Sequence, residues 1–295
     1  MLAGRVTRSA DPHMEASMSW VTRQFDTRTI VLMPIAIAIN IVLGVTVQQV
    51  LKLPIYLDSI GTILVGVLAG PIAGALTGIL SNLIWQYAPG IGGGTIGPFA
   101  ITAGVIGLLA GLWGRLGVYR SRPASGTQLI VAAVIAAALI VVIVVPIIGN
   151  PAYTNPQIGG YPDWVFSAAI VIAVIAAVVV AGFILVRRDL AGFWVAAAGA
   201  ATGIVAALVS APIAAYVFGG VTGSGVDVIV AALRQGGSDV LQASVGQGLF
   251  SDPIDKTITS FVVFIILASL SRRVVARFPN GERLTGGAST GNLSA

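Results

Sequence analysis

The stretch LDSIGTILVGVLAGPIAGALTGILSNLIWQY, residues Leu57–Tyr87, decides the fold of this chain. It carries one charged residue, Asp58. Four glycines follow at intervals of four: Gly66, Gly70, Gly74 and Gly78. Such spacing leaves a strip without side chains along one helix face, so that a neighbouring helix can pack closely in lipid. Pro71 interrupts the helix because proline has no N–H and restricts the preceding residue. The stretch therefore predicts two helices that meet at Gly70–Pro71.

The composition around this stretch is that of a membrane protein. The 295 residues are 56% hydrophobic and 9% charged, and the mean hydropathy is +0.96. Charged residues make up about a quarter of a typical soluble chain, and several windows here exceed the roughly 20 apolar residues that span a bilayer. The apolar runs are continuous, which disfavours the alternation of a transmembrane β-barrel. We therefore expect an all-α polytopic protein of the plasma membrane.

Arginine clusters indicate which ends of the spans face the cytoplasm. They comprise Arg5, Arg8, Arg23 and Arg28; Arg115, Arg120 and Arg122; Arg187 and Arg188; and Arg272, Arg273, Arg277 and Arg283. About eight transmembrane helices with both termini inside place every cluster on one side. The expected spans are 29–51, 58–70, 71–87, 95–116, 128–151, 164–186, 190–219 and 253–270. Residues 58–87 form a re-entrant hairpin in the alternative interpretation, because 13 helical residues reach only about 20 Å.

The remaining segments divide into a basic N-terminus, an outer segment and a tail. Residues 1–28 lack the features of a cleavable signal peptide. The outer segment 220–252 is mildly amphipathic and splits at Gly236–Gly237, so it is expected to lie on the membrane surface as a lid. Residues 272–295, rich in Gly, Ser and Thr, are expected to form a disordered cytoplasmic tail. The transmembrane domain is then 29–271.

The sequence offers no catalytic constellation. It has no cysteine and a single histidine, His13, which excludes histidine triads and Cys/His metal sites. The glycine-rich GIGGGTIG at 90–97 lacks the lysine of a phosphate-binding loop. We therefore expect no catalytic residues, no metal and no cofactor. The positive charge lies beside apolar spans, which indicates membrane orientation and not nucleic-acid binding.

Polar residues within the apolar spans are the candidate ligand-binding groups, because they are costly in lipid and tend to face a cavity or a partner. Asn82, Trp85 and Gln86 share one helix face by their spacing, and an aromatic ring beside two amides suits a planar hydrogen-bonding ligand. Gln247 and Asp255 complete the expected substrate site. In the alternative interpretation the amides satisfy one another between helices and Trp85 anchors the membrane interface.

Two acidic segments have a structural explanation as helix starts. Asp58-Ser59 and SDPIDK, residues Ser251–Lys256, both place polar side chains at the start of a helical run. Such residues cap the first turn and complement the helix dipole. Capping alone explains both segments, and a ligand role for them is the competing hypothesis.

Residues 61–84 and 249–273 together resemble the substrate-specific S components of energy-coupling factor (ECF) transporters. The resemblance rests on GTILVGVLAGPIAGALTGILSNLI and on LFSDPIDKTITSFVVFIILASLSRR, where a DK pair begins the final helix. It implies a subunit that captures a small water-soluble vitamin or related nutrient from outside. Delivery inward would need a coupling T subunit and two ATPase subunits.

The resemblance also implies a six-helix core and a docking face. Removing about 123–188 as one inserted hairpin leaves six helices with both termini inside. The first helix of the family often carries Ala-xxx-Ala pairs that dock on the T subunit. Ala36, Asn40 and Gly44 take the matching positions here, so we expect them to face that partner.

Two other functions remain open from the sequence. One is a membrane sensor module, since related glycine-rich helices occur in the input domains of some bacterial kinases. The other is a self-contained secondary transporter or channel that uses helices broken at Pro71 and Pro98. The identity of a ligand does not follow from the sequence.

Overall fold

A computed structural model describes residues 20–88, 95–148 and 164–286, without the side chains of 142–148 and of most of 164–169. Within these ranges the protein is helical and contains no strand beyond the isolated bridge of Pro123 with Asp189. Four helices of the described part are long and apolar enough to cross a membrane: Thr27–Val50, Gly97–Arg115, Ile170–Arg187 and Ala191–Phe218. The expected class of helical membrane protein is thereby supported. The count of eight spans stays a prediction.

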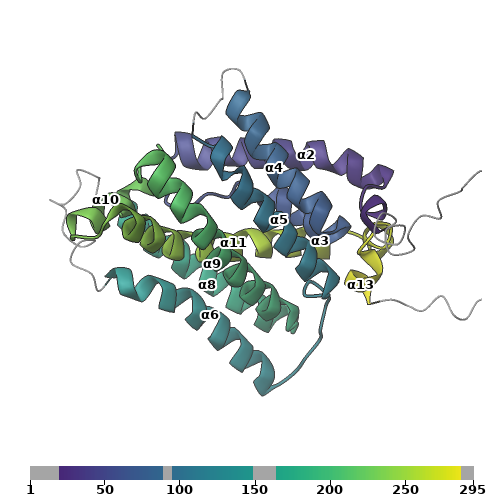
Figure 1. The fold of residues 1–295 in the computed structure, drawn as a ribbon. Helices are drawn as coiled ribbons and strands as arrows, with labels where there is room; N and C mark the ends of the chain where they lie inside the picture. Colours follow the sequence, from purple (N-terminus) through teal and green to yellow (C-terminus); the bar gives the residue numbers. More distant parts are fainter. Residues whose placement is uncertain (1–19, 89–94, 149–163, 287–295) are drawn as a thin grey trace, which may run out of the picture.

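The helices follow one another along the chain as coloured in Figure 1. They are α2 (Thr27–Gly44) with its π-helical extension η1 (Val45–Val50), α3 (Ile60–Ala69), α4 (Pro71–Tyr87), the short η2 (Gly97–Phe99), α5 (Ala100–Arg115), α6 (Thr127–Ile148), α8 (Trp164–Arg187), α9 (Ala191–Phe218), α10 (Asp227–Gln235), α11 (Val240–Ser269), α12 (Arg272–Val275) and α13 (Gly281–Thr285).

The predicted helix break lies at Gly70. Helix α3 ends at Ala69 and α4 begins at Pro71. Gly70 has a φ of +129°, a conformation that residues with a side chain rarely adopt. The Oε1 atom of Gln24 accepts the N–H of Ile72 at 2.9 Å, so a side chain from the N-terminal segment satisfies the first turn of α4. The break is therefore built by glycine, proline and an external cap.

The glycine strip lies against α5. A Cβ atom on Gly66 would lie 2.9 Å from the carbonyl oxygen of Gly107, and one on Gly74 would lie 2.6 Å from the same atom. A Cβ atom on Gly78 would overlap the backbone of Ala103. Three of the four predicted packing glycines thus allow backbone contact with α5, while the fourth provides the turn described above.

The helices form three groups in space. Helices α2, α3, α4 and α5 pack together, α9 pairs extensively with α11, and α6 pairs with α8. The α6–α8 pair lies at the edge of the molecule remote from α2 and α4, and it contacts α9 and α11 (Figure 1). Any site shared by α3, α4, α5, α9 and α11 therefore lies at the centre of the bundle.

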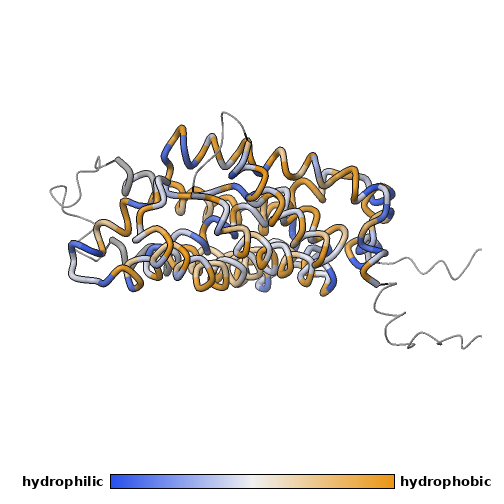
Figure 2. Tube along the Cα trace, turned by 45° about the horizontal axis from the view of Figure 1, so that its top comes forward, coloured by the Kyte–Doolittle hydropathy of each residue, from blue (hydrophilic) through white to orange (hydrophobic). Residues whose placement is uncertain are grey.

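The outer surface is apolar along the helices. Figure 2 shows hydrophobic residues over most of their length and hydrophilic ones mainly toward the ends of the bundle. Large side chains such as Val31, Val134 and Val178 are 60%, 61% and 65% exposed. Exposed apolar surface of this extent is typical of a face that contacts lipid or a partner.

The last long helix, α11, begins earlier than residue 253, where the last span was expected to start. It begins at Val240, where Asp239 and Gln242 form a reciprocal capping box, and it runs unbroken through Pro253. The predicted break at Gly236–Gly237 is present, since α10 ends at Gln235. The second half of the lid segment 220–252 is thus part of the last helix and not a separate surface piece. The capping explanation for 251–253 is wrong, because these residues are interior to α11.

A disordered tail was expected from residue 272 onward, and this prediction is wrong for residues 272–286. Helices α12 and α13 form there, and Asn280 lies between them. Its backbone N–H donates to the carbonyl of Leu68 at 2.9 Å, and its side-chain Nδ2 donates to the carbonyl of Val67 at 3.0 Å. These carbonyls belong to the last turn of α3, where intrahelical partners are missing. Residues 287–295 lie outside the described ranges.

Candidate functional site

A polar cavity of about 90 Å³ lies between α4 and α5 on one side and α9 and α11 on the other. Residues of the segments 56–59 and 220–227 also line it. Its polar lining consists of Gln48, Tyr56, Asp58, Ser59, Asn82, Thr95, Thr102, Ser210, Thr222, Ser224, Asp227, Gln247, Asp252 and Lys256. Buried polar groups at this density in an apolar helical bundle mark a candidate binding site.

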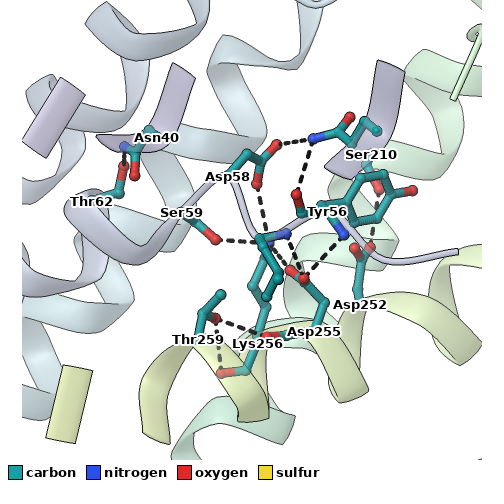
Figure 3. Close-up of polar contacts among 12 residues, drawn as sticks. Asn40, Tyr56, Asp58, Ser59, Thr62, Ser210, Asp252, Asp255, Lys256 and Thr259 are labelled. Carbon is teal, nitrogen blue, oxygen red and sulfur yellow. Dashed lines mark hydrogen bonds and ion pairs between the residues drawn. The ribbon is translucent and has the colours of Figure 1, made fainter. Parts of the chain in front are cut away.

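A buried lysine joins α11 to the segment before α3. The Nζ atom of Lys256 donates to Asp255 and to the Ser59 hydroxyl, the latter at 2.9 Å, and lies 3.6 Å from the Asp58 carboxylate (Figure 3). The side chains of Lys256 and Asp255 are 3% and 0% exposed. Buried charges of this kind persist only when paired and hydrogen-bonded.

Asp255 positions a loop and does not line the cavity, so its expected place among the ligand-lining residues is wrong. Its Oδ1 atom accepts the backbone N–H groups of Tyr56 at 3.1 Å and Leu57 at 2.8 Å. Leu57 has a φ of +52°, a region that is unfavourable for a branched side chain. The carboxylate thus holds the chain in the turn that brings Asp58 and Ser59 to the lysine.

Helix packing places this cluster. Gly199 and Gly203 of α9, a GxxxG pair evident in the sequence, contact the backbone of α11 between Asp252 and Thr257. A Cβ atom on Gly199 would lie 2.6 Å from the carbonyl oxygen of Lys256. These glycines let α9 pack directly on the part of α11 that carries Asp252 and Lys256.

Tyr56 lies over the charged cluster as a neutral hydrogen-bonding group. Gln247 Nε2 donates to its hydroxyl at 3.1 Å, and its ring centroid is 5.7 Å from Lys256 Nζ. Burial, with the nearby charge of Asp252, raises the pKa of the Tyr56 phenol well above its usual value. The hydroxyl therefore stays protonated at physiological pH.

Two of the five expected substrate residues, Asn82 and Gln247, line the cavity. Trp85 does not: it is 2% exposed and packs with Ile37 and Ile41 of α2. Gln86 accepts the N–H of Gly97 at 2.8 Å and thereby supports the start of η2. The expected aromatic platform beside two amides is wrong, because the three side chains diverge toward three different neighbours.

The expected partner-facing residues of α2 lie inside the bundle, and that expectation is wrong as well. Ala36 and Asn40 are 0% and 1% exposed. The amide of Asn40 donates to the hydroxyls of Thr62 at 2.8 Å and Ser81 at 3.0 Å. A Cβ atom on Gly44 would lie 2.5 Å from the Trp85 ring. The small and polar face of α2 packs against α3 and α4 of the same chain.

Tyr56, Asp252 and Lys256 line the cavity but are not among the expected substrate-binding residues, and a ligand role for the last two was only the competing hypothesis to helix capping. A signal for two of them was present. Asp252 and Lys256 are four residues apart, and residues at this spacing share one helix face.

A metal site receives no support from the described residues. Among them, no group of three His, Cys, Asp or Glu residues is placed to hold a metal ion. Comparison with family models, with curated proteins and with solved structures finds no match to this chain.

Proposed function

We propose that this chain is the substrate-binding membrane subunit of an ECF-type importer and captures a small water-soluble vitamin or related nutrient from outside. The observation that carries the proposal is the buried polar cavity that α4 and α5 form with the α9–α11 pair. Polar and charged groups inside a membrane bundle are expensive and mark ligand or ion sites. A volume of about 90 Å³ lies below the roughly 300 Å³ of typical drug-sized pockets and favours a compact solute.

The proposed topology has eight spans, both termini in the cytoplasm, and a six-helix core with the α6–α8 pair as an inserted hairpin. Arg120, Arg187 and Arg272 come from three different parts of the chain and line one hollow near the chain's C-terminal helices. Their proximity supports placing three arginine clusters on one side of the membrane. The edge position of α6 and α8 supports the insertion (Figure 1).

Single-cysteine labelling tests this topology, because the native chain contains no cysteine. Val221 is 67% exposed beside the cavity, and Ser125 is exposed near the arginine clusters. We expect Val221→Cys to react with an impermeant maleimide in intact cells and Ser125→Cys to react only after permeabilisation. The reverse pattern would invert the orientation, and equal labelling of both in intact cells would contradict it.

The binding function predicts that Gln247→Ala weakens affinity by about fivefold to tenfold, because one hydrogen-bonding group of the cavity is lost. The matched control is Gln235→Ala, an exposed glutamine at the end of α10. Thermal-shift screening of water-soluble vitamins on the purified chain identifies the ligand, and titration compares the variants. Failure of every vitamin to stabilise the chain, together with no retained ligand by mass spectrometry, would count against the proposal.

The proposed partners are a T subunit and two ATPase subunits. The small face of α2 lies inside the bundle, so we propose that the partners dock on the exposed apolar face of α2 instead. That face is formed by Ile30, Val31, Ile35, Ile39 and Val42. Co-purification with such partners tests this assignment. Uptake into proteoliposomes by the chain alone would instead indicate a secondary transporter, for which the broken helix at Gly70 is the favouring observation.

A further inference from the structure

Asp252 is a buried carboxylate at the cavity whose hydrogen bonding is incomplete. It is 5% exposed. The one hydrogen bond that the described residues make with its carboxylate comes from the Ser210 hydroxyl at 3.5 Å, the weak limit of such a contact (Figure 3). A carboxylate offers about four acceptor positions. Most of the accepting capacity of Asp252, a residue that lines the cavity, is therefore unused by the described residues.

The neighbouring charges compensate Asp252 only in part. Lys256 is the cation in the cavity lining, and its Nζ atom already donates to Asp255 and Ser59. Asp58 lies 3.6 Å from the same Nζ atom and shares that charge. Asp227 accepts hydrogen bonds from the segment 222–223 and adds a further negative charge to the lining. Carboxylates thus outnumber ammonium groups around this space.

Thr102, on the side of the cavity opposite Asp252, is a second and independent sign of a bound ligand. It lines the cavity from α5 and is 7% exposed. Its Oγ1 atom has no hydrogen-bond partner among the described residues. Buried hydroxyls are nearly always satisfied by protein or water, so this group points to an occupant that hydrogen-bonds.

We infer that the cavity binds a small solute that carries a positively charged nitrogen, with Asp252 as its counter-ion and the Thr102 hydroxyl as a second contact. The inference rests on the proposed function, because it names the ligand class of the same site. A cationic nitrogen provides the missing charge to Asp252 and donors for its free acceptor positions. An anionic solute would meet an excess of carboxylates, and a neutral one would leave Asp252 only partly compensated.

The test uses the full chain in detergent and the low-molecular-weight filtrate of a yeast extract as the probe. The wild type is equilibrated with the filtrate and washed, and the retained solutes are identified by mass spectrometry. Two variants are treated in parallel: Asp252→Asn, and Asp239→Asn, which changes an acidic residue at the exposed start of α11. Size-exclusion profiles verify that each variant is folded.

The expected result is a retained solute that is cationic at neutral pH. Its affinity should fall about tenfold to a hundredfold in Asp252→Asn and stay unchanged in Asp239→Asn. A neutral or anionic solute on the wild type overturns the charge assignment and leaves the binding function intact. A cationic solute held equally by folded Asp252→Asn overturns the role of Asp252. Retention of nothing by the wild type overturns the binding function itself.

Thr102→Val is a second variant that keeps the inference testable if Asp252→Asn does not fold. Valine preserves the shape of threonine and removes the hydroxyl that faces the cavity. We expect affinity for the cationic solute to fall by about fivefold. Unchanged affinity would remove Thr102 from the site, and the charge of the solute held by the wild type still decides the ligand class.

Discussion

Replacing Asp255 with alanine is expected to lower the free energy of unfolding by about 3–5 kcal/mol, the typical cost of breaking a buried ion pair by removing one partner. The Lys256 side chain, 3% exposed, would keep only the Ser59 hydroxyl and a more distant carboxylate. The backbone N–H groups of Tyr56 and Leu57 would lose their acceptor. The segment 56–59 would then no longer be held against α11.

A double-mutant cycle separates the ion pair from the loop contacts. Removing both charges in Asp255→Asn/Lys256→Met should cost less than the sum of the two single variants, with a coupling energy of up to about 3 kcal/mol. Unfolding in detergent by urea, followed by tryptophan fluorescence, gives the free energies. Asp239→Asn is the control, because it keeps a side-chain cap on α11 and is expected to stay within about 0.5 kcal/mol of the wild type. Full stability of Asp255→Ala would refute the argument.

The features of the fold that the sequence predicts well are local ones. The break at Gly70–Pro71 follows from the backbone chemistry of two adjacent residues. The glycine strip follows from helix periodicity, and three of its members contact α5. Both inferences hold without knowledge of the neighbouring helix, since any close neighbour satisfies them.

The site residues are harder to predict because they depend on which neighbour occupies each part of a helix face. Asn82, Trp85 and Gln86 cover an arc of about 100° around α4, given 3.6 residues per turn. That arc is shared by the cavity, by α2 and by the start of η2. Spacing therefore identified a polar face, and only the packing of other helices decides which of its members reaches the cavity.

The face of α2 illustrates the same limit. Small and polar residues at 36, 40 and 44 require a close neighbour in lipid. The pattern does not say whether that neighbour belongs to the same chain. The hydroxyls of Thr62 and Ser81 satisfy Asn40 from within, and nothing at positions 36–44 alone distinguishes them from groups on a second protein.

Gly107→Leu is expected to produce a large loss of folded protein, because it disrupts the packing of α5 on the N-terminal group of helices. A Cβ atom at this position would overlap the carbonyl group of Gly74 and lie 2.5 Å from the backbone nitrogen of Ala75. A flexible side chain can change its rotamer to make room for an added methyl group. The atoms that a Cβ on Gly107 would contact are backbone atoms of α4, which cannot move in this way. Overpacking that side chains absorb costs about 1–3 kcal/mol, so a clash with backbone should exceed that range and separate α5 from the α3–α4 hairpin.

Gly182→Leu is the matched control, because a Cβ atom at Gly182 on α8 would meet no atom within 4 Å. Both variants add the same apolar side chain to an apolar helix, so membrane insertion improves equally in the two. We expect Gly182→Leu to give a monodisperse size-exclusion peak and a thermal midpoint close to that of the wild type. Gly107→Leu should give little folded protein. Equal midpoints for the two variants would show that α5 does not pack on the glycines of α4, and the cavity that depends on this contact would have to be placed elsewhere.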